Sequence, residues 1–322
     1  MKYINSSTGL MMVLLLVVAG CGKQSSEEAE QQTGESSSVV AEGARLTSVT
    51  GDYNFDTAGS PLYMDGSYYF TNNNFEQPEQ SRTMRKSPSG QIDTLRVDNG
   101  VTTTLQASGN GTIYACEMLG HRVVELNTDG EVIRVVADEY NGTRIDGPND
   151  IVVDDKGGFY FSDSQFIAGG EKMQETPAVY YVNAEGEVIR VIDDIEFPNG
   201  MGLSPDGSTL YVANTRGSHL LACDVNSDGT VTNKRNFAEL QIPEGAQESG
   251  ADGMAVDSQG NVYVATTQGI GVQVFDNEGN HIQNISAPTA TNNVSFSGEQ
   301  NNVILIAAQD GIYQIQGKHA GS

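Results

Sequence analysis

The sequence lacks tryptophan and is poor in cysteine, histidine and basic residues. Its 322 residues include three Cys, four His, and 17 Lys plus Arg against 42 Asp plus Glu, for a formal net charge of −25 at pH 7. Because this charge repels phosphate backbones, the composition excludes nucleic-acid binding through a basic face. The histidines, at positions 121, 219, 281 and 319, do not have the spacing of metal ligands, which disfavours a zinc site.

Two further absences concern helices and nucleophiles. No segment after Cys21 shows a long apolar period of 3.6 residues, so helix is expected to be scarce. There is no Gly-x-Ser-x-Gly elbow, no phosphate-binding loop and no Cys–His pair, so a nucleophilic triad is not indicated. Glycine is abundant instead, with 37 residues and no three-residue period, which favours an all-β fold with many tight turns.

The first twenty residues have the features of an export signal. Residues 10–19 form an unbroken apolar run of ten, which is too short to span a bilayer as a helix. Residues 18–21, Val-Ala-Gly-Cys, resemble a bacterial lipobox, which implies cleavage before Cys21 and lipidation of that residue; an ordinary signal peptide is the alternative. Gly22 replaces the aspartate typical of inner-membrane retention, so the resemblance implies a lipoprotein anchored in the outer membrane.

Residues 23–42 are dominated by Ser, Glu and Gln. Such a segment cannot bury enough apolar surface to offset the entropy lost on folding. We therefore predict a lipidated cysteine with a disordered tether over residues 21–42, and a folded domain over residues 43–318. Cys116 and Cys223 fall two repeats apart and are predicted to be unpaired, buried thiols.

A repeat organises the folded domain. A turn followed by a Tyr-bearing strand recurs from Tyr69 onward at intervals of 45, 46, 51, 52 and 42 residues, the last copy being degenerate. A second hairpin, marked by an Asp-Gly or Glu-Gly pair, lies between most copies. Two hairpins per repeat give four strands, and six copies predict a six-bladed β-propeller with four-stranded antiparallel blades. Residues 45–55 are expected to complete the last blade and close the ring.

Three oxygen-bearing residues occupy equivalent places in successive repeats. Asn149, Asn199 and Asp252 each stand eight residues before a turn glycine, where the chain enters a blade's inner strand. In a propeller these positions form a ring at one mouth of the central channel. Any one of these residues alone would more often be a turn residue, but three in register favour a set of ligands. An oxygen-only set of low charge suits a hard divalent cation such as Ca²⁺. Asn293 is a weaker candidate from the sixth blade.

At these residues the chain resembles the gluconolactonase and senescence-marker-protein (regucalcin-like) family of six-bladed propellers. The resemblance covers nearly all of residues 50–316 and is carried by segments 147–151 (Gly-Pro-Asn-Asp-Ile), 161–163 (Phe-Ser-Asp), 197–201 (Phe-Pro-Asn-Gly-Met) and 251–257 (Ala-Asp-Gly-Met-Ala-Val-Asp). It implies one divalent cation held by Asn149, Asn199 and Asp252, most typically Ca²⁺, with Mg²⁺, Mn²⁺ or Zn²⁺ as alternatives. It also implies hydrolysis of a sugar lactone, with the cation polarising the carbonyl and Asp252 helping to activate water.

The chain departs from the family pattern in the first blade. The family's Glu-Gly-Pro aligns with residues 59–61, Gly-Ser-Pro, so the fourth metal ligand is absent. Losing a carboxylate should weaken cation affinity. Glu117, at the end of a predicted inner strand, could compensate, or could be a solvated strand-end charge. Asp150, beside a ligand, could orient that ligand's amide, or could form an Asx turn.

Three functions remain open. The first is a cation-dependent hydrolase of a sugar lactone or similar small ester. The second is a propeller that binds a small molecule or an envelope partner without turnover, as the missing glutamate would allow. The third is a related hydrolase of another electrophile, such as a phosphotriester. We expect a monomer with a small-molecule substrate. Loops 166–177 and 243–250, which are polar and Gly-rich, are expected to form the pocket walls and to favour a hydroxylated substrate.

Overall fold

The computed structural model describes residues 38–97, 100–166 and 172–322. The predicted signal peptide, Cys21 and the predicted tether up to residue 37 lie outside the described residues. Within the described part, the one helix is a short 3₁₀ turn, η1 (Pro78–Gln80). This helix is neither long nor apolar enough to span a membrane, and the described residues contain no other helix.

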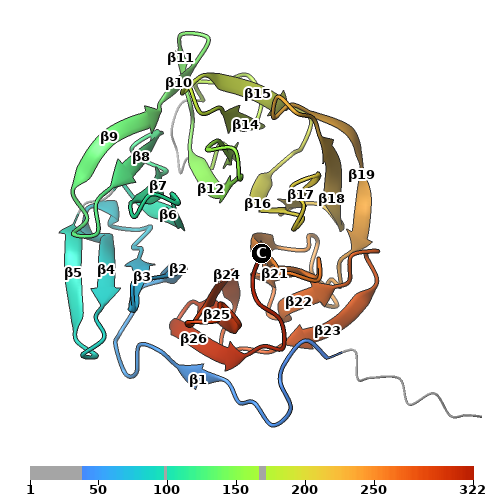
Figure 1. Cartoon of the computed structure of the whole chain (residues 1–322). Coiled ribbons are helices and arrows are strands. Elements are labelled where there is room, and N and C mark those ends of the chain that lie inside the picture. Colours follow the sequence, from blue (N-terminus) through green and yellow to red (C-terminus); the bar gives the residue numbers. More distant parts are fainter. Residues whose placement is uncertain (1–37, 98–99, 167–171) are drawn as a thin grey trace, which may run out of the picture. The chain divides into compact units, whose positions relative to one another are not determined.

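Six four-stranded antiparallel sheets surround a central axis, which confirms the predicted six-bladed β-propeller (Figure 1). Each sheet runs in chain order from its innermost to its outermost strand, except that the sixth is completed by the N-terminal strand. The strands of blades one to three are β2 (Ala58–Met64), β3 (Ser67–Asn72), β4 (Arg82–Lys86), β5 (Ile92–Val97); β6 (Thr102–Ala107), β7 (Ile113–Glu117), β8 (Arg122–Leu126), β9 (Val132–Ala137); and β12 (Pro148–Val153), β13 (Phe159–Asp163), β14 (Ala178–Val182), β15 (Val188–Ile192).

The strands of blades four to six are β16 (Pro198–Leu203), β17 (Thr209–Asn214), β18 (His219–Val225), β19 (Val231–Glu239); β20 (Ala251–Val256), β21 (Val262–Thr266), β22 (Gly271–Phe275), β23 (His281–Ile285); and β24 (Thr291–Ser297), β25 (Val303–Ala308), β26 (Gly311–Gln316), β1 (Thr47–Ser48). A separate small hairpin, β10 (Glu139–Tyr140) and β11 (Thr143–Arg144), joins blades two and three. The pairing of β1 with β26 confirms that residues from the 45–55 segment close the ring.

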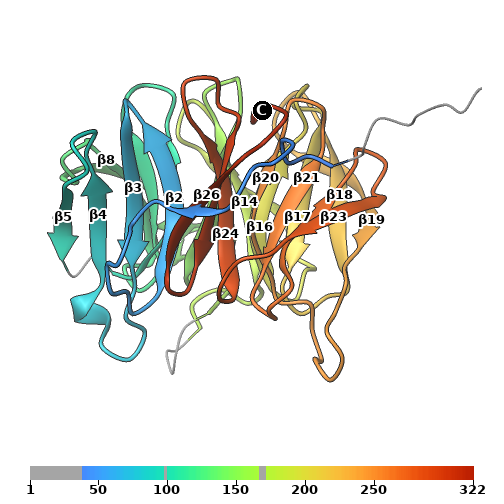
Figure 2. The same ribbon diagram turned by 90° about the horizontal axis from the view of Figure 1, so that it is seen from below.

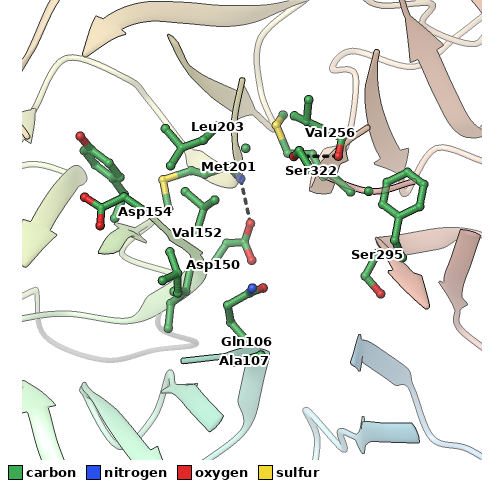
Figure 3. Close-up of a pocket in the computed structure, with 18 of the residues that line it drawn as sticks. Gln106, Ala107, Asp150, Val152, Asp154, Met201, Leu203, Val256, Ser295 and Ser322 are labelled. Atoms are coloured by element: carbon green, nitrogen blue, oxygen red, sulfur yellow. Dashed lines mark hydrogen bonds between the residues drawn. The ribbon is translucent and has the colours of Figure 1, made fainter. Parts of the chain in front are cut away.

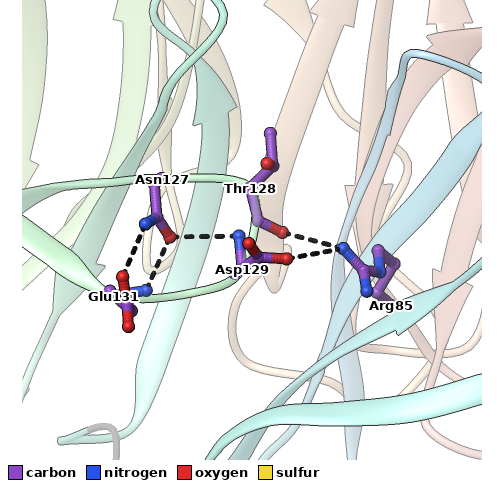
Figure 4. Close-up of polar contacts among 5 residues, drawn as sticks. All are labelled: Arg85, Asn127, Thr128, Asp129 and Glu131. Atoms are coloured by element: carbon purple, nitrogen blue, oxygen red, sulfur yellow. Dashed lines mark hydrogen bonds and ion pairs between the residues drawn. The ribbon is translucent and has the colours of Figure 1, made fainter.

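The glycine-marked hairpins have the conformation that the repeat predicts. In the turn between β8 and β9, Gly130 has a φ of 85°, and its N–H donates to the Asn127 carbonyl at 3.0 Å. The Asn127 side chain accepts from the backbone N–H of Asp129 and Glu131 at 3.0 and 2.9 Å (Figure 4). Arg85 of blade one binds Asp129 at 3.2 Å, so this turn also ties two neighbouring blades together.

The core consists of six apolar clusters, one at each interface between neighbouring blades. In the cluster between blades four and five, for example, Tyr211 and Leu220 pack against Met254 and Phe275. The inner strands contact one another in ring order around the axis. Because the core is divided into six thin layers between sheets, alternate residues of each strand are enough to fill it. A hydrophobic content of 38% is therefore sufficient for this fold.

The folded domain extends beyond the predicted limits of 43 and 318. Residues 38–42, placed by composition in the tether, pack on the propeller: Val39 is buried and accepts a hydrogen bond from the Lys318 N–H at 2.8 Å. At the other end, Ser322 donates its backbone N–H to Val256 at 2.9 Å. Cys116 and Cys223 lie in blades two and four, unpaired and buried as predicted.

Candidate functional site at the propeller axis

Two cavities open at opposite ends of the inner strands. The first residues of these strands line a cavity of about 340 Å³, and their last residues line one of about 540 Å³. Ser322, the last residue, lines the larger cavity. The C-terminus lies near the centre of the ring of blades (Figure 1), at one end of the propeller (Figure 2). The smaller cavity is lined by all the predicted axial residues except Glu117, namely Asn149, Asp150, Asn199, Asp252 and Asn293.

A β-bulge explains why the second residue of most inner strands faces the axis. In β6, β12, β16, β20 and β24 the pairing register with the next strand shifts directly after the first residue. Such a bulge leaves a residue unpaired and redirects its side chain. The second residues, counted around the ring from blade one, are Gly59, Thr103, Asn149, Asn199, Asp252 and Asn292, and all six line the smaller cavity.

The ring position of the sixth blade is therefore Asn292, which the sequence analysis missed. Asn293, the predicted candidate, is paired with Ala307 one position further along β24. It still lines the cavity, and its side chain packs on Gly253, where an added Cβ would lie 2.4 Å from the Asn293 Cγ. In blade two the ring residue is Thr103, whose hydroxyl donates to the Asn149 carbonyl at 2.8 Å.

Hydrogen bonds fix the orientation of several amides around the cavity. The Asn199 Nδ2 donates to Thr215 at 3.0 Å, and the Asn292 Nδ2 donates to the Ala58 carbonyl at 2.7 Å. Both bonds use the nitrogen and leave the amide oxygen available to a ligand. Asn73, directly after β3, behaves similarly: its Nδ2 binds the Thr102 carbonyl at 2.8 Å, and its buried Oδ1 has no partner in the described part of the chain.

Asn73 was also missed from the sequence. It is 5% exposed and lines the cavity on the same blade as Gly59. A buried amide oxygen without a partner is costly unless water or a ligand satisfies it. The signal that could have found Asn73 is the run Asn72–Asn74 directly after a Tyr-bearing strand.

Two glycines bring the strands of the ring close together. A Cβ on Gly200 would lie 2.1 Å from the Asp252 carbonyl oxygen, so only glycine allows β16 to approach β20 at this point. Asn199 and Asp252 are each followed by such a glycine, namely Gly200 and Gly253. The close approach holds the two candidate ligands side by side.

Asp150 bridges three inner strands from the centre of the channel. Its Oδ1 accepts from the Thr104 hydroxyl at 2.8 Å. Its Oδ2 accepts from the Met201 N–H, also at 2.8 Å (Figure 3). It lines both cavities and is 5% exposed. Neither of the predicted roles, an Asx turn or the orientation of a neighbouring amide, matches these bonds. Asp150 instead joins blades two, three and four behind the ring.

Burial also sets the electrostatics of the two axial carboxyls. It raises the pKa of Asp150 to about 6, with the bonds from Met201 and Thr104 acting in the opposite direction. Burial, reinforced by the charge of Asp150, raises the pKa of Asp252 to about 7, while a hydrogen bond from the Asn199 side chain opposes this shift. Two carboxylates at a channel axis repel each other, which a bound cation would relieve.

Glu117 does not supply the compensating carboxylate. It is 1% exposed and does not line the cavity, where the next residue, Met118, takes part instead. Its two carboxylate oxygens form ion pairs with Arg96 of blade one and Arg122 of β8, both at 2.6 Å. Glu117 therefore joins blades one and two and has no oxygen directed at the axis.

The donor set fits a hard divalent cation. The described residues contain no cluster of three or more His, Cys, Asp or Glu side chains arranged to hold a metal, so amides must supply most of the ligands. Asn149, Asn199, Asn292 and Asp252 offer oxygens only, which are the ligands of Ca²⁺ and not those that zinc prefers. Gly59, in the ring position of blade one, offers none.

The walls of the cavity differ from the prediction. Phe166, from the first predicted loop, lines it, but none of residues 243–250 does. The mouth also contains Phe75 and Phe197, so part of the wall is aromatic rather than polar.

Residues 58–309 match the sequence profile of the SMP-30/Gluconolactonase/LRE-like region. Among curated proteins, the chain is 25% identical over 229 residues to a gluconolactonase of Zymomonas mobilis, a match that covers 67% of this chain and 63% of that protein. It is 26% identical over 241 residues to the diisopropyl-fluorophosphatase of Loligo vulgaris, covering 67% and 75%. It is 27% identical over 241 residues to the lactonase drp35 of Staphylococcus aureus, covering 73% and 68%.

Solved structures confirm the architecture. The gluconolactonase XC5397 from Xanthomonas campestris superposes with a TM-score of 0.75 at 24% identity, covering 87% of this chain and 91% of that one. A regucalcin from Agrobacterium tumefaciens, described as a calcium-binding protein, superposes with a TM-score of 0.67 at 19% identity, covering 84% and 93%. The profile match spans most of the propeller, and the chain therefore belongs to the SMP-30/gluconolactonase/LRE-like family.

Proposed function

We propose that this protein is a cation-dependent lactonase whose reaction takes place in the smaller axial cavity. The observation that carries the proposal is the ring of oxygen donors, in which one carboxylate, Asp252, stands beside Asn149 and Asn199 at the floor of a cavity of about 340 Å³. That volume lies at the lower end of the range for small-molecule sites. The relatives named gluconolactonase and lactonase support the same reaction class.

Each ring residue has a role that follows from its chemistry. Asn149, Asn199 and Asn292 would hold the cation through their amide oxygens, and Asp252 would add the one negative charge of the ring. A divalent cation bound there would supply Lewis-acid polarisation of the lactone carbonyl. Asp252 lines the cavity, where its carboxylate can accept a proton from the attacking water. Asp150 keeps the inner strands of blades two, three and four in register through Thr104 and Met201.

The test is metal analysis of the purified protein combined with a pH-stat assay of lactone hydrolysis. We expect hydrolysis that chelation abolishes and that Ca²⁺ or another divalent cation restores. Asp252→Ala should remove both cation binding and hydrolysis. Hydrolysis that persists unchanged after chelation would contradict the proposal.

Two other functions are favoured by specific observations. Gly59 leaves blade one without a ring ligand, as expected for a propeller that binds a small molecule without turning it over. The similarity to the Loligo diisopropyl-fluorophosphatase favours hydrolysis of an organophosphate in the same cavity. Assays with diisopropyl fluorophosphate and with lactones distinguish the three functions. Hydrolysis of diisopropyl fluorophosphate alone would support the organophosphate hydrolase, and hydrolysis of neither compound would support a protein that only binds its ligand.

We further propose that the protein acts as a monomeric lipoprotein anchored in the outer membrane through Cys21. The support is the lipobox-like sequence of residues 18–21. Metabolic labelling with a radioactive fatty acid should mark the protein, and Cys21→Ser should abolish the label and release the protein in soluble form. A labelled Cys21→Ser variant would contradict the assignment.

A further inference from the structure

Three phenylalanines from three different blades meet at the mouth of the smaller cavity. Phe75 follows β3, Phe166 follows β13, and Phe197 precedes β16. The rings of Phe75 and Phe166 lie 6.4 Å apart, and those of Phe166 and Phe197 lie 5.9 Å apart, both edge to face. All three residues line the cavity whose floor is the oxygen ring.

Two of these rings are unusually exposed for their type. Phe75 is 47% and Phe166 46% exposed, and they are the two exposed phenylalanines in the described part of the chain. An exposed apolar cluster at the rim of a cavity generally marks a binding surface. In contrast, most other aromatic side chains of the described residues pack in the clusters between blades.

Hydrogen bonds hold the described backbone beside each phenylalanine. Beside Phe75, the Asn74 side chain accepts from the Glu76 and Gln77 N–H groups at 3.1 and 2.8 Å. Next to Phe197, the chain is fixed by the bond from its N–H to the Asn214 side chain at 3.2 Å and by the Thr215 N–H that donates to its carbonyl at 3.1 Å.

Gln165, the residue before Phe166, is held in the same way. The Gln165 Nε2 donates to Asp146 at 2.9 Å and to the Gln174 carbonyl at 2.7 Å, and its backbone N–H binds Asp163 at 3.2 Å. Hydrogen bonds therefore hold the described backbone next to each ring, which lowers the entropy cost of binding a ligand there.

The phenylalanines stand apart from the rest of the lining. Blades five and six contribute the polar side chains of Thr267, Thr291, Asn292 and Gln309, and blades one to four contribute Asn73, Thr103 and Thr215 as well as the phenylalanines and the buried Met118. A ligand that spans the cavity therefore meets oxygen ligands at the floor and apolar rings at the mouth.

We propose that the preferred substrate is a lactone with an apolar, planar body, and not a polyhydroxylated sugar lactone. This inference rests on the proposed lactonase function. The ester carbonyl would face Asn149, Asn199 and Asp252 at the floor, and the body would pack against Phe75, Phe166 and Phe197. Hydroxyl groups packed against the three rings would lose water without gaining hydrogen bonds from those rings, whereas an aromatic body would make the edge-to-face contacts that the phenyl groups favour.

The experiment compares two lactones and one inert analogue. Dihydrocoumarin carries an aromatic body, and glucono-δ-lactone carries hydroxyl groups. The lactam of dihydrocoumarin, 3,4-dihydro-2-quinolone, has the same shape but resists hydrolysis, so its binding is measured by calorimetry on the cation-loaded protein. We expect kcat/KM to favour dihydrocoumarin, and the Phe75→Ser and Phe166→Ser variants each to lower it about 10-fold, mainly through KM, with lactam affinity falling in parallel.

The variants have matched controls. Phe75→Leu keeps an apolar side chain and should retain most of the lactam affinity. Ile133→Ser removes an apolar side chain that is 53% exposed on β9, away from the cavity, and should change nothing. Glucono-δ-lactone turnover should stay within about twofold in all variants because its hydroxyl groups gain nothing from the phenyl wall.

The outcomes separate this inference from the proposed function. Faster turnover of glucono-δ-lactone, unaffected by Phe75→Ser and Phe166→Ser, would overturn the apolar-substrate inference and leave the lactonase proposal standing. Lactam binding that depends on the phenylalanines, without turnover of either lactone, would support the apolar site and contradict the lactonase proposal. Failure to bind the lactam and to hydrolyse either lactone would overturn both.

Discussion

The floor and the mouth of the axial cavity are built by different parts of the fold. The floor comes from the second residues of the inner strands, whose side chains a repeated β-bulge turns toward the axis. The mouth comes from connections between strands, which carry Phe75, Phe166 and Phe197. Because every blade repeats the strand pattern but not the connections, the floor can keep a common chemistry while the mouth varies. We infer that the floor determines the reaction and the mouth selects the substrate.

The largest effect is expected for the carboxylate of the floor. Asp252→Ala removes the one charged member of the ring and should weaken cation affinity about 100-fold or more. Calorimetric titration with Ca²⁺ measures the change. Asp129→Ala is the matched control, since its carboxylate lies in an exposed turn of blade two (Figure 4) and should leave the affinity unchanged. Equal affinities in the two variants would remove Asp252 from the site.

A smaller effect is expected for the amides, and it tests the register of the sixth blade. Asn292→Ala should weaken cation affinity about 10-fold, because it removes a neutral ligand and no charge. Asn293→Ala, one position further along β24, should change it less than about threefold. The same titration compares them. A larger effect of Asn293→Ala would show that Asn293, and not Asn292, is the cation ligand of blade six, which contradicts the assignment from the pairing register.

Because Gly59 leaves the ring position of blade one without a ligand, adding a carboxylate there should increase the affinity for the cation. Gly59 does not need a positive φ, and an added Cβ would meet the Thr71 hydroxyl at 3.0 Å and the Asn292 Oδ1 at 3.8 Å. Gly59→Glu therefore requires only a small shift of Thr71. Since it adds a carboxylate to the ring, it should tighten cation binding about 10-fold. An unchanged affinity in a folded Gly59→Glu variant would show that Gly59 does not face the cation.

The smallest effect on cation binding is expected for Glu117, which ends β7 and does not line the cavity. Glu117→Gln should leave cation affinity unchanged. It should lower the free energy of unfolding by about 2 kcal/mol, because it weakens the two ion pairs with Arg96 and Arg122, one of which is partly exposed. Urea unfolding of the cation-free protein measures the loss. A variant with normal stability and weakened cation binding would restore Glu117 as a ligand.

The sequence predicted the features that repeat. Turn glycines, Tyr-bearing strands and their spacing are local signals, and they identified the six blades and the equivalence of Asn149, Asn199 and Asp252. Asn292 was missed because blade six is shorter at this point: its turn glycine, Gly298, follows six residues later and not eight. The bulge that turns these side chains to the axis depends on strand pairing, which a count of residues does not reveal.

The features that depend on contacts between blades could not be predicted. Glu117 was considered a ligand because its two arginine partners are distant in sequence or lie across a hairpin, and only the fold brings them together. The phenyl wall has the same origin, since Phe75, Phe166 and Phe197 come from three blades. The composition of residues 166–177 and 243–250 suggested a polar wall because it averages over residues, whereas a single ring, Phe166, is what the first segment contributes to the lining and the second contributes nothing.

The most direct test of the cation ring is anomalous diffraction from crystals grown with Mn²⁺. The ring account predicts a single anomalous peak at the axis, in contact with the side-chain oxygens of Asn149, Asn199 and Asp252 and absent from crystals of Asp252→Ala. A peak in the opposite cavity, near Asp154 or Asp206, or the lack of any peak at the axis in crystals of the unaltered protein, would contradict it.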